Sequence, residues 1–496
     1  MKNEKYILAI DQSTSGTKVM LVNTRGEYIH KCAGDHIQYY PKADWVEHDP
    51  VDIYENVKTL LKEIVQTSGI SQEELAVLAI TNQRETVVVW DRETGIPVYN
   101  AIVWQCRRTS DFCEELKEQG YEEMIQSKTG LKVDPYFSAS KIKWILDHVD
   151  GVKDRAREGM LLAGTVDSWL IWKLTCGNVH ATDYSNASRT LLFNIKTLQW
   201  DDQLLDLFDI PYTMLPVVKS SNEIFGVTED PNLPFTSLPI SGVIGDSQGS
   251  LFGQKCFEPG MAKATYGTGT SLMMHTGELV KGTKGLVTSI AWGLNGKVDY
   301  ALEGIINSTG DVIKWLKEQL ELIGDVDEAE QLANSVPDNQ GVYLVPAFVG
   351  LGAPYWNPYT RAAILGMSRN TGKPHIVRAA LESITYQVKD VIGSMETQSN
   401  IHLMSLKADG GATSNRFLMQ YQADILNLDV MVSQVSELSS MGSVYLAGLG
   451  VGIWNSVDEI RELNQEYEQY YPIMSSNIRD KNYQGWKDSV KVVLVK

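Results

Sequence analysis

The sequence predicts an α/β protein made of two similar domains that face each other across a cleft. The chain has 496 residues, of which 43% are hydrophobic, and a typical domain has roughly 100–200 residues. Strand-like apolar segments alternate with amphipathic helix-like segments, the pattern of a sheet covered by helices. Each half also contains a strand that ends in an aspartate and a turn of small residues, at Asp11 and at Asp246. This repeated unit indicates a duplicated domain.

The first half shows a regular order of elements. Apolar runs flank a polar tip over residues 6–22, which predicts a strand, a tight turn and a second strand. Apolar residues recur at helical spacing over 52–66, and the unbroken apolar run 75–80 predicts a buried strand. The elements that follow are a helix over 141–149, a strand at 161–164, a helix over 167–174 and a long loop with prolines over 222–239.

The second half is predicted to restart the first. Residues 240–250 form an apolar strand that leads into Asp246 and a small-residue turn, and 264–271 contains another hydroxyl and glycine turn between strands. A strand over 403–409 precedes the glycine-rich turn 410–415, where a helix begins. Free N–H groups at a helix start suit an anion. We therefore predict two domains, at residues 1–252 and 253–496.

Composition limits the classes of partner and compartment. Acidic residues outnumber basic ones by 62 to 44, so the formal net charge is −18, which argues against nucleic acid and anionic membranes as partners. The five cysteines include no C-x-x-C pair, which predicts a reducing compartment without a disulfide framework or zinc site. No signal peptide or membrane span is expected, because the apolar runs are too short. These features predict a cytoplasmic protein.

The hairpin tip at residues 13–17 resembles a phosphate-binding device. It contains only hydroxyl residues and glycine, so its backbone N–H groups and hydroxyls are open to a phosphate. Lys18 adds positive charge, and Asp11 is placed to hold a metal-bound water. The alternative is an ordinary surface hairpin. A Walker A motif is absent, because 366–373 has the wrong spacing, and the glycines of 448–452 are attributed to helix packing.

Several longer segments carry a family resemblance. They are Thr81–Thr86, Ala101–Arg108, Tyr136–His148, Ala362–Gly366 and His375–Glu382. Together with three phosphate-type turns, they resemble the FGGY carbohydrate kinase family, and within it the glycerol kinases, over nearly the whole chain. The resemblance implies two actin-like ATPase (ribonuclease H-like) domains. It also implies transfer of the γ-phosphoryl group of ATP, with Mg²⁺, to a hydroxyl of glycerol, which gives glycerol 3-phosphate.

The resemblance assigns roles to individual residues. Asp246 matches the family's catalytic base, and Asp11 and Asp246 are the expected magnesium ligands. A free aspartate has a pKa near 3.9, so Asp246 must orient the hydroxyl and accept its proton late in the reaction. The expected acceptor-binding residues are Arg84, Glu85, Trp104, Tyr136, Asp246 and Ser247. The expected nucleotide-binding residues are Thr14, Ser15, Gly16, Lys18, Thr268, Gly310, Lys314, Gly411 and Asn415.

The sequence departs from the glycerol kinase pattern at three positions. Ser247 stands where glycerol kinases usually carry Gln, Ser271 where they usually carry Phe, and Lys314 where they commonly carry Gln. Loss of the Phe removes an apolar wall worth roughly 1–3 kcal/mol, and loss of the Gln at Ser247 shortens a hydrogen-bonding arm. Both changes enlarge the acceptor pocket and make it more polar. An acceptor longer than glycerol, a four- or five-carbon polyol or a sugar, is therefore the alternative substrate. Glycerol stays slightly ahead because the other acceptor residues are present.

The sequence also bears on regulation and assembly. The segment 225–239 contains neither histidine nor a Gly-Gly pair, so two controls known in glycerol kinases, a sugar bisphosphate loop and a phosphorylated histidine, are doubtful here. The expected assembly is a homo-oligomer, a dimer or tetramer. A non-catalytic actin-like scaffold is the competing class, and the presence of Asp246 in a polar pocket argues against it.

Overall fold

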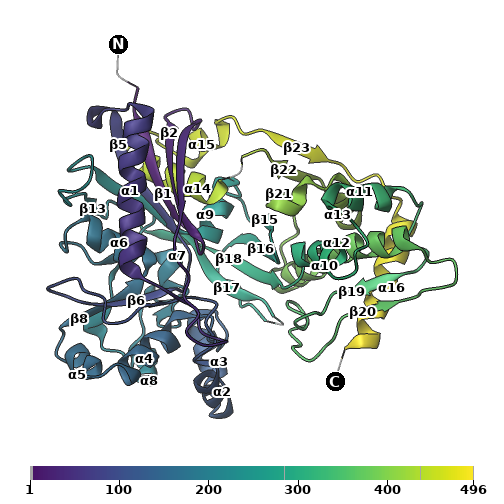
Figure 1. Ribbon diagram of the computed structural model, residues 1–496, viewed down its shortest axis with the longest axis horizontal. Coiled ribbons are helices and arrows are strands. Elements are labelled where there is room, and N and C mark those ends of the chain that lie inside the picture. Colours follow the sequence, from purple (N-terminus) through teal and green to yellow (C-terminus); the bar gives the residue numbers. More distant parts are fainter. Residues whose placement is uncertain (1–3, 284, 436, 495–496) are drawn as a thin grey trace.

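Two α/β parts lie side by side in the computed structural model, which describes residues 4–283, 285–435 and 437–494 (Figure 1). The first sheet, in the order β13-β14-β5-β1-β2-β3, pairs β1 antiparallel with β2 and parallel with β5. Side chains of β1 alternate between the two faces of the sheet, so Leu8 and Ile10 enter one core and Ile7 and Ala9 another. Its strands are β1 (Tyr6–Gln12), β2 (Gly16–Asn23), β3 (Tyr28–Asp35), β5 (Leu75–Asn82), β13 (Gly226–Val227) and β14 (Pro239–Gly245).

The second sheet repeats the central arrangement of the first. Its order is β17-β18-β16-β15-β21-β22-β23, with β15 antiparallel to β16 and parallel to β21. The duplication predicted from the sequence is therefore confirmed at the level of topology. The strands are β15 (Met261–Tyr266), β16 (Thr270–Gly277), β17 (Val287–Leu294), β18 (Lys297–Ile306), β21 (Ser405–Asp409), β22 (Val430–Ser433) and β23 (Tyr467–Tyr470).

The position of the repeat differs from the prediction. Strand β14, which carries Asp246 at its end, pairs in parallel with β5 and belongs to the first sheet. The strand equivalent to β1 is β15, whose hairpin with β16 turns at residues 267–269. The prediction that the second half restarts at residue 240 was wrong, because an aspartate after an apolar strand marks the cleft edge of a sheet and not the start of a domain.

Helices cover the first sheet, and a smaller lobe lies beneath it (Figure 1). Helix α1 (Pro50–Ser68) begins where the Asp49 side chain accepts a hydrogen bond from Val51 N, and it ends at Gly69 with a left-handed φ of 69°. The expected elements over 52–66, 75–80 and 161–174 are all present. The strands of the lobe are β4 (Glu47–His48), β6 (Val87–Asp91), β7 (Ala101–Ile102) and β8 (Leu161–Thr165), and its helices are α2 (Ser110–Glu118), α3 (Glu122–Thr129), α4 (Ser138–His148), α5 (Val152–Arg157) and α8 (Asp202–Phe208). Nearby segments are α6 (Val166–Leu174), α7 (Tyr184–Ala187), β9 (Ala181–Asp183), β10 (Phe193–Asn194), β11 (Gln199–Trp200) and β12 (Val217–Lys219).

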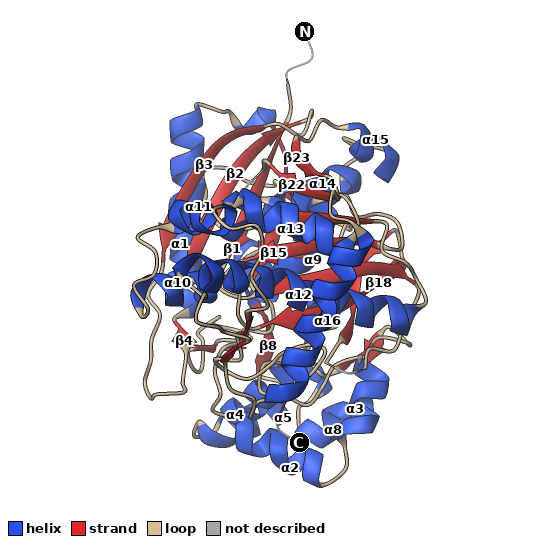
Figure 2. Cartoon of the chain, turned by 90° about the vertical axis from the view of Figure 1, so that its right-hand side faces the viewer, coloured by secondary structure: helices blue, strands red, loops and turns tan. Residues whose placement is uncertain are grey.

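A layer of helices covers the second sheet on its outer side (Figure 2). The 27-residue α12 (Lys373–Ser399) runs through this layer and contributes Leu381 and Val388 to the core. No helix in the described residues is long and apolar enough to cross a membrane. The other elements here are α10 (Gly310–Glu318), α11 (Val326–Asn334), α13 (Arg416–Leu426), α16 (Ser476–Val493), β19 (Tyr343–Val345) and β20 (Ala363–Leu365), with α15 (Val457–Glu462) near the first part.

Two helices cross at the junction between the parts with their backbones in close contact. They are α9 (Asp246–Gly253) and α14 (Leu438–Gly450). A Cβ added to Gly442 would lie 2.0 Å from Gly249 O, and one added to Gly253 would lie 2.1 Å from Leu438 O. Only glycine permits this approach. The glycines at 448 and 450 likewise face Trp454 and Ser241 at 2.2 Å, which supports a packing role for that run.

Candidate active site

Asp246 lies at the junction of the two parts, where β14 ends and α9 begins. Its Oδ1 accepts a hydrogen bond from Ser247 N at 2.6 Å and lies 3.2 Å from Nε of Arg84. The Asp246 side chain is 39% exposed, whereas Arg84 is 5% exposed. The carboxylate is therefore fixed from behind and open to a ligand in front.

A buried network of four charges lies behind Asp246. Arg84 NH2 donates to Glu303 Oε1 at 2.8 Å, and Arg189 NH1 lies 2.7 Å from Glu303 Oε2. Arg189 Nε donates to Glu85 Oε1 at 2.5 Å. Burial opposes the charge on Glu303, but attraction by Arg189 and Arg84 outweighs it and lowers the Glu303 pKa to about 2. Because Glu303 is in β18, the network connects the two parts of the molecule.

An aromatic corner adjoins the charged network. Trp104 and Tyr136 meet edge to face with ring centroids 5.3 Å apart. Trp104 Nε1 donates to Thr14 Oγ1 at 2.9 Å, which joins this corner to the β1–β2 hairpin. Both aromatic side chains are partly buried, so they can present a flat wall to the carbon side of a small polar ligand.

The positions of the two unusual serines also have charged neighbours. Ser247 is partly buried in the first turn of α9, and Ser271 is partly buried in β16. The ammonium of Lys263, which is 1% exposed, donates to Ser271 Oγ at 3.2 Å. Burial lowers the Lys263 pKa. A hydroxyl held by an ammonium therefore stands at the position where the sequence departs from the usual phenylalanine.

The β1–β2 hairpin places Asp11 inside the molecule. The Asp11 side chain accepts a hydrogen bond from Ser440 of α14 at 3.3 Å and is 7% exposed. Burial raises the Asp11 pKa to about 7; Lys18 opposes this shift, and the nearby charges of Asp246 and Glu437 add to it. Two carboxylates that repel each other in this way fit a divalent cation, and Mg²⁺ accepts one or two carboxylates together with waters and phosphate oxygens. Asp11 and Asp246 would hold it.

The hairpin tip is shaped by its own hydrogen bonds. The Ser13 backbone N and its hydroxyl both donate to Gly16 O at 2.9 Å. A Cβ at Gly16 would lie 2.6 Å from Gly34 O, so only glycine fits there. Ser15 is exposed at the tip and Thr14 is partly buried. Lys18 points to Glu437 of α14, with Nζ 2.7 Å from Oε2, so its ammonium is paired in this structure.

The predicted nucleotide-binding residues of the second half come together around the β15–β16 turn. Thr268 is exposed in that turn, and its carbonyl accepts a hydrogen bond from Thr309 N at 2.9 Å. Gly310 N, at the start of α10, donates to Gly267 O at 3.0 Å. Gly410 has a φ of 98° and lies against Tyr266, because a Cβ there would be 2.5 Å from Tyr266 O. Three glycine-containing turns thus line one surface.

Three further predicted residues lie beside that surface. Gly411 is exposed, and the space around its Cα is open. The Asn415 side chain caps α13 by accepting from Leu418 N at 2.9 Å, and its buried Nδ2 has no hydrogen-bond partner in the described residues. Lys314 points outward on α10, 68% exposed and 3.7 Å from Glu318. The unpaired Asn415 amide is a donor that a ligand could use.

Sequence reasoning missed five residues of this site, namely Arg189, Lys263, Glu303, Glu437 and Ser440. Two of them left a signal that could have been used. Glu303 interrupts the apolar run of β18, and Lys263 interrupts that of β15. A charged residue in a buried strand is rarely present without a partner. The partners themselves could not be identified from the chain.

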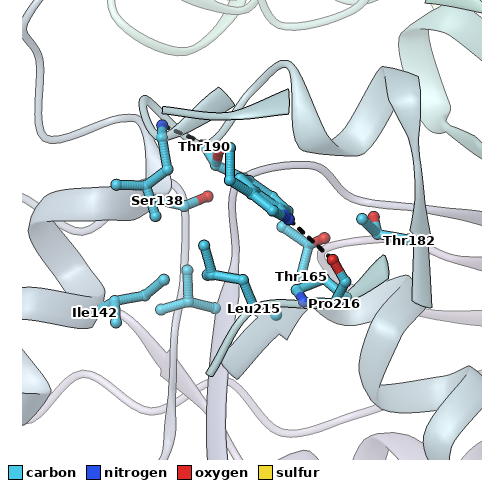
Figure 3. A pocket seen from close by; sticks show the side chains of 11 residues that line it. Ser138, Ile142, Thr165, Thr182, Thr190, Leu215 and Pro216 are labelled. Atoms are coloured by element: carbon cyan, nitrogen blue, oxygen red, sulfur yellow. Dashed lines mark hydrogen bonds between the residues drawn. The ribbon is translucent and has the colours of Figure 1, made fainter. Parts of the chain in front are cut away.

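One small cavity in the first part is too small for a substrate (Figure 3). Its volume is about 10 Å³, and its lining includes Ser138, Thr165, Thr182 and Leu215. A cavity of this size holds about one water. The acceptor is therefore expected at Asp246 and not here.

Two family models match the chain in succession. The N-terminal domain of the FGGY family of carbohydrate kinases matches residues 6–253, and the C-terminal domain matches residues 262–451. The chain belongs to the FGGY family of carbohydrate kinases. Its two sheets are accordingly the two actin-like domains of an FGGY fold.

Relatives within the FGGY family match the chain over nearly its whole length. It is 51% identical over 492 residues to a glycerol kinase of Alkaliphilus metalliredigens, with 99% of this chain and 98% of that protein covered. It is 52% identical over 487 residues to glycerol kinase 2 of Thermotoga maritima, with 98% of each covered. The crystal structure of Plasmodium falciparum glycerol kinase with ADP is similar, with a TM-score of 0.95, 38% identity and 99% of each chain covered.

Proposed function

We propose that this FGGY kinase transfers the γ-phosphoryl group of ATP to glycerol and produces glycerol 3-phosphate. The observation that carries the proposal is the fixed and accessible carboxylate of Asp246, held by Arg84 Nε and Ser247 N at the domain junction. The high identity to glycerol kinases over nearly the whole chain supports glycerol as the acceptor, and the ADP-bound relative supports ATP as the donor.

In the proposed reaction, a glycerol hydroxyl oxygen attacks the γ-phosphorus while the bond to the β-phosphate bridging oxygen breaks. Asp246 orients that hydroxyl and takes its proton as the oxygen–phosphorus bond forms. Arg84 donates to the other hydroxyls, Glu85 accepts from them, and Tyr136 can do either. Trp104 covers the carbon edge. The charged network restrains Arg84 and Glu85 in place before the substrate binds.

The nucleotide is proposed to lie between the β1–β2 hairpin and the turns of the second domain. Thr14, Ser15, Gly16, Lys18 and Thr268 face its phosphates, and Gly310, Lys314, Gly411 and Asn415 face its adenosine. Lys18 must exchange Glu437 for a phosphate to do so. Bound Mg²⁺, held by Asp11 and Asp246, would neutralise phosphate charge.

A second candidate acceptor is a larger polyol or sugar. The Ser271 hydroxyl beside the Lys263 ammonium favours it, since these polar groups could hydrogen-bond an extra hydroxyl. The test is kcat/KM for glycerol, erythritol, threitol and xylitol with ATP. Glycerol should exceed the others by roughly a hundredfold. A preference for a four- or five-carbon polyol would replace glycerol as the substrate while leaving the kinase assignment intact.

The role of Asp246 is tested by Asp246→Asn, which keeps the shape of the side chain and removes the base. The rate should fall by a factor on the order of 10² to 10⁴, while ADP binding measured by calorimetry should remain close to that of the wild type. Asp299→Asn, in β18, is the control and should keep full activity. An unchanged rate in Asp246→Asn would remove this residue from the mechanism.

Three broader properties belong to the same proposal. The domains divide between residues 252 and 253, the protein acts in the cytoplasm, and it assembles as a dimer or tetramer. Sedimentation at equilibrium measures the assembly directly, and a monomer at all concentrations would contradict that part.

A further inference from the structure

A pocket of about 350 Å³ lies at the far end of α9 from Asp246. An eight-residue helix is roughly 12 Å long, so this pocket is separate from the acceptor site. It is bounded by the segment after α9, β15, β21, α15 and the start of β23. Its lining residues are Lys255, Glu258, Met261, Met404, Ser405, Lys407, Arg461, Leu463, Gln465 and Tyr467.

The pocket holds more positive than negative charge. Lys255, Lys407 and Arg461 are basic, and Glu258 is the single acidic residue of the lining. Arg461 NH2 pairs with Glu258 at 3.1 Å, which leaves the two lysines. Neither lysine has a carboxylate within 4 Å among the described residues, although each is only 6% exposed. Buried ammonium groups without a counter-ion are costly, so this arrangement indicates a missing anion.

Neutral contacts satisfy the two ammonium groups only in part. Lys255 Nζ donates to Leu463 O at 2.5 Å, and Lys407 Nζ donates to Gln254 O and to Tyr467 OH. Each ammonium has three protons to donate, so both retain capacity. Burial, followed by repulsion from Lys407, lowers the Lys255 pKa to about 8. An anion between the two would reverse that effect.

One further polar group of the pocket lacks a partner. Ser405 Oγ is buried without a hydrogen-bond partner in the described part of the chain, and its hydroxyl could donate to an anion. This hydroxyl is independent of the charge count and lines the same pocket.

We propose that this pocket is a binding site for a small phosphate-bearing anion, distinct from the catalytic cleft. A phosphate dianion could neutralise both lysines and offers several acceptors for their free protons. Met261, Met404 and Leu463 form an apolar side to the pocket, and its volume is within the range of small-molecule sites. Such a ligand would connect α9 to β21 and to the loop that follows α15.

The test titrates inorganic phosphate into the protein by calorimetry, with ADP and glycerol present at saturation so that the cleft is occupied. The wild type should bind one phosphate per chain. Lys255→Met and Lys407→Met should each weaken this binding by about tenfold or more. Lys491→Met, which removes a 70% exposed charge elsewhere, is the matched control and should bind like the wild type. Equal affinity in all four proteins, or no saturable binding to the wild type, would overturn the proposal.

A further variant keeps the test informative if the two lysine variants fail to fold. Arg461 is 48% exposed, so Arg461→Gln should fold normally. It should still weaken phosphate binding, because it leaves the negative charge of Glu258 unpaired in the lining of the pocket. Crystals soaked in tungstate, a heavy tetrahedral dianion, should show anomalous density between Lys255 and Lys407. Density confined to the catalytic cleft would contradict the site.

Discussion

Glu303 pairs with two arginines at once, and this makes it the residue on which the acceptor side depends. Its two oxygens contact Arg84 and Arg189, and it is fully buried. Removing one member of a buried ion network leaves uncompensated charge and costs about 3–5 kcal/mol. The same change frees Arg84, which contacts Asp246. Stability and acceptor binding should therefore fall together.

We expect Glu303→Gln to raise KM for glycerol by about tenfold or more and to lower the thermal midpoint, because Arg84 loses its fixed position. Steady-state kinetics and calorimetry measure the two effects. The matched control is Glu382→Gln, a buried glutamate that contacts Arg378 in α12 at 2.8 Å. It should lower stability without changing KM for glycerol. A KM shift of equal size in both variants would reduce the network to a purely structural role.

Local sequence could identify one side of this network but not the other. Arg84, Glu85 and Asp246 stand in long motifs with a recognisable pattern. Arg189 and Glu303 do not, and Glu303 meets Arg84 across 219 residues of chain. A pairing over that distance is set by the packing of two domains, which no local pattern reports. Lys18 illustrates the same limit, because its partner Glu437 lies 419 residues away.

At the level of elements, α9 both carries the proposed catalytic residue and makes the close contact with α14. Its first residue is Asp246, and its glycines let α14 approach to backbone contact. Since α14 also holds Ser440 against Asp11, this crossing sets the distance between the two carboxylates. A substitution at the crossing should therefore alter the active site even though the substituted residue does not contact it.

We expect Gly442→Ala to reduce activity and to destabilise the protein by about 1–3 kcal/mol, because its Cβ would lie 2.0 Å from Gly249 O. Unfolding calorimetry and the rate of ADP formation measure both. Gly393→Ala in α12 is the matched control, since no atom lies within 4 Å of a Cβ there. It should stabilise the helix by about 0.5–1 kcal/mol. If both substitutions behave alike, the close crossing does not control the site.

The sequence predicted most elements but misplaced one of them. Strands and helices with strong periodicity, such as β5 and α1, occur where expected. The pattern of 240–245 resembles that of β1 and predicts the start of the repeated unit, yet this strand lies in the first sheet, beside β5. The pattern of apolar residues in a strand indicates its burial and its period, but it does not indicate which neighbouring strand it pairs with. Topology therefore required the structure.

The whole molecule contains groups that make its stability depend on pH. His48 is fully buried, its Nδ1 lies 3.4 Å from Gln83 Nε2, and its ring meets His36 edge to face. Burial, followed by the charge of His36, lowers the His48 pKa to about 3. Asp167 acts in the opposite sense, because burial and Asp183 raise its pKa to about 6. A single pH profile of the wild type would therefore mix opposing effects.

A difference measurement isolates His48. The unfolded chain takes up this proton below pH 6.5 while the folded protein does not, so the folded state loses stability as pH falls from 6.5 towards 3. At pH 5 the loss is roughly 2 kcal/mol. In His48→Asn the amide oxygen replaces Nδ1 as acceptor and cannot be protonated in this range, so this variant should gain on the wild type by that amount between pH 7.5 and 5. His402→Asn, at a side chain that is 99% exposed, should follow the wild type at both pH values. Parallel losses in all three proteins would show that His48 is protonated in the folded state and that its burial does not exclude the charge.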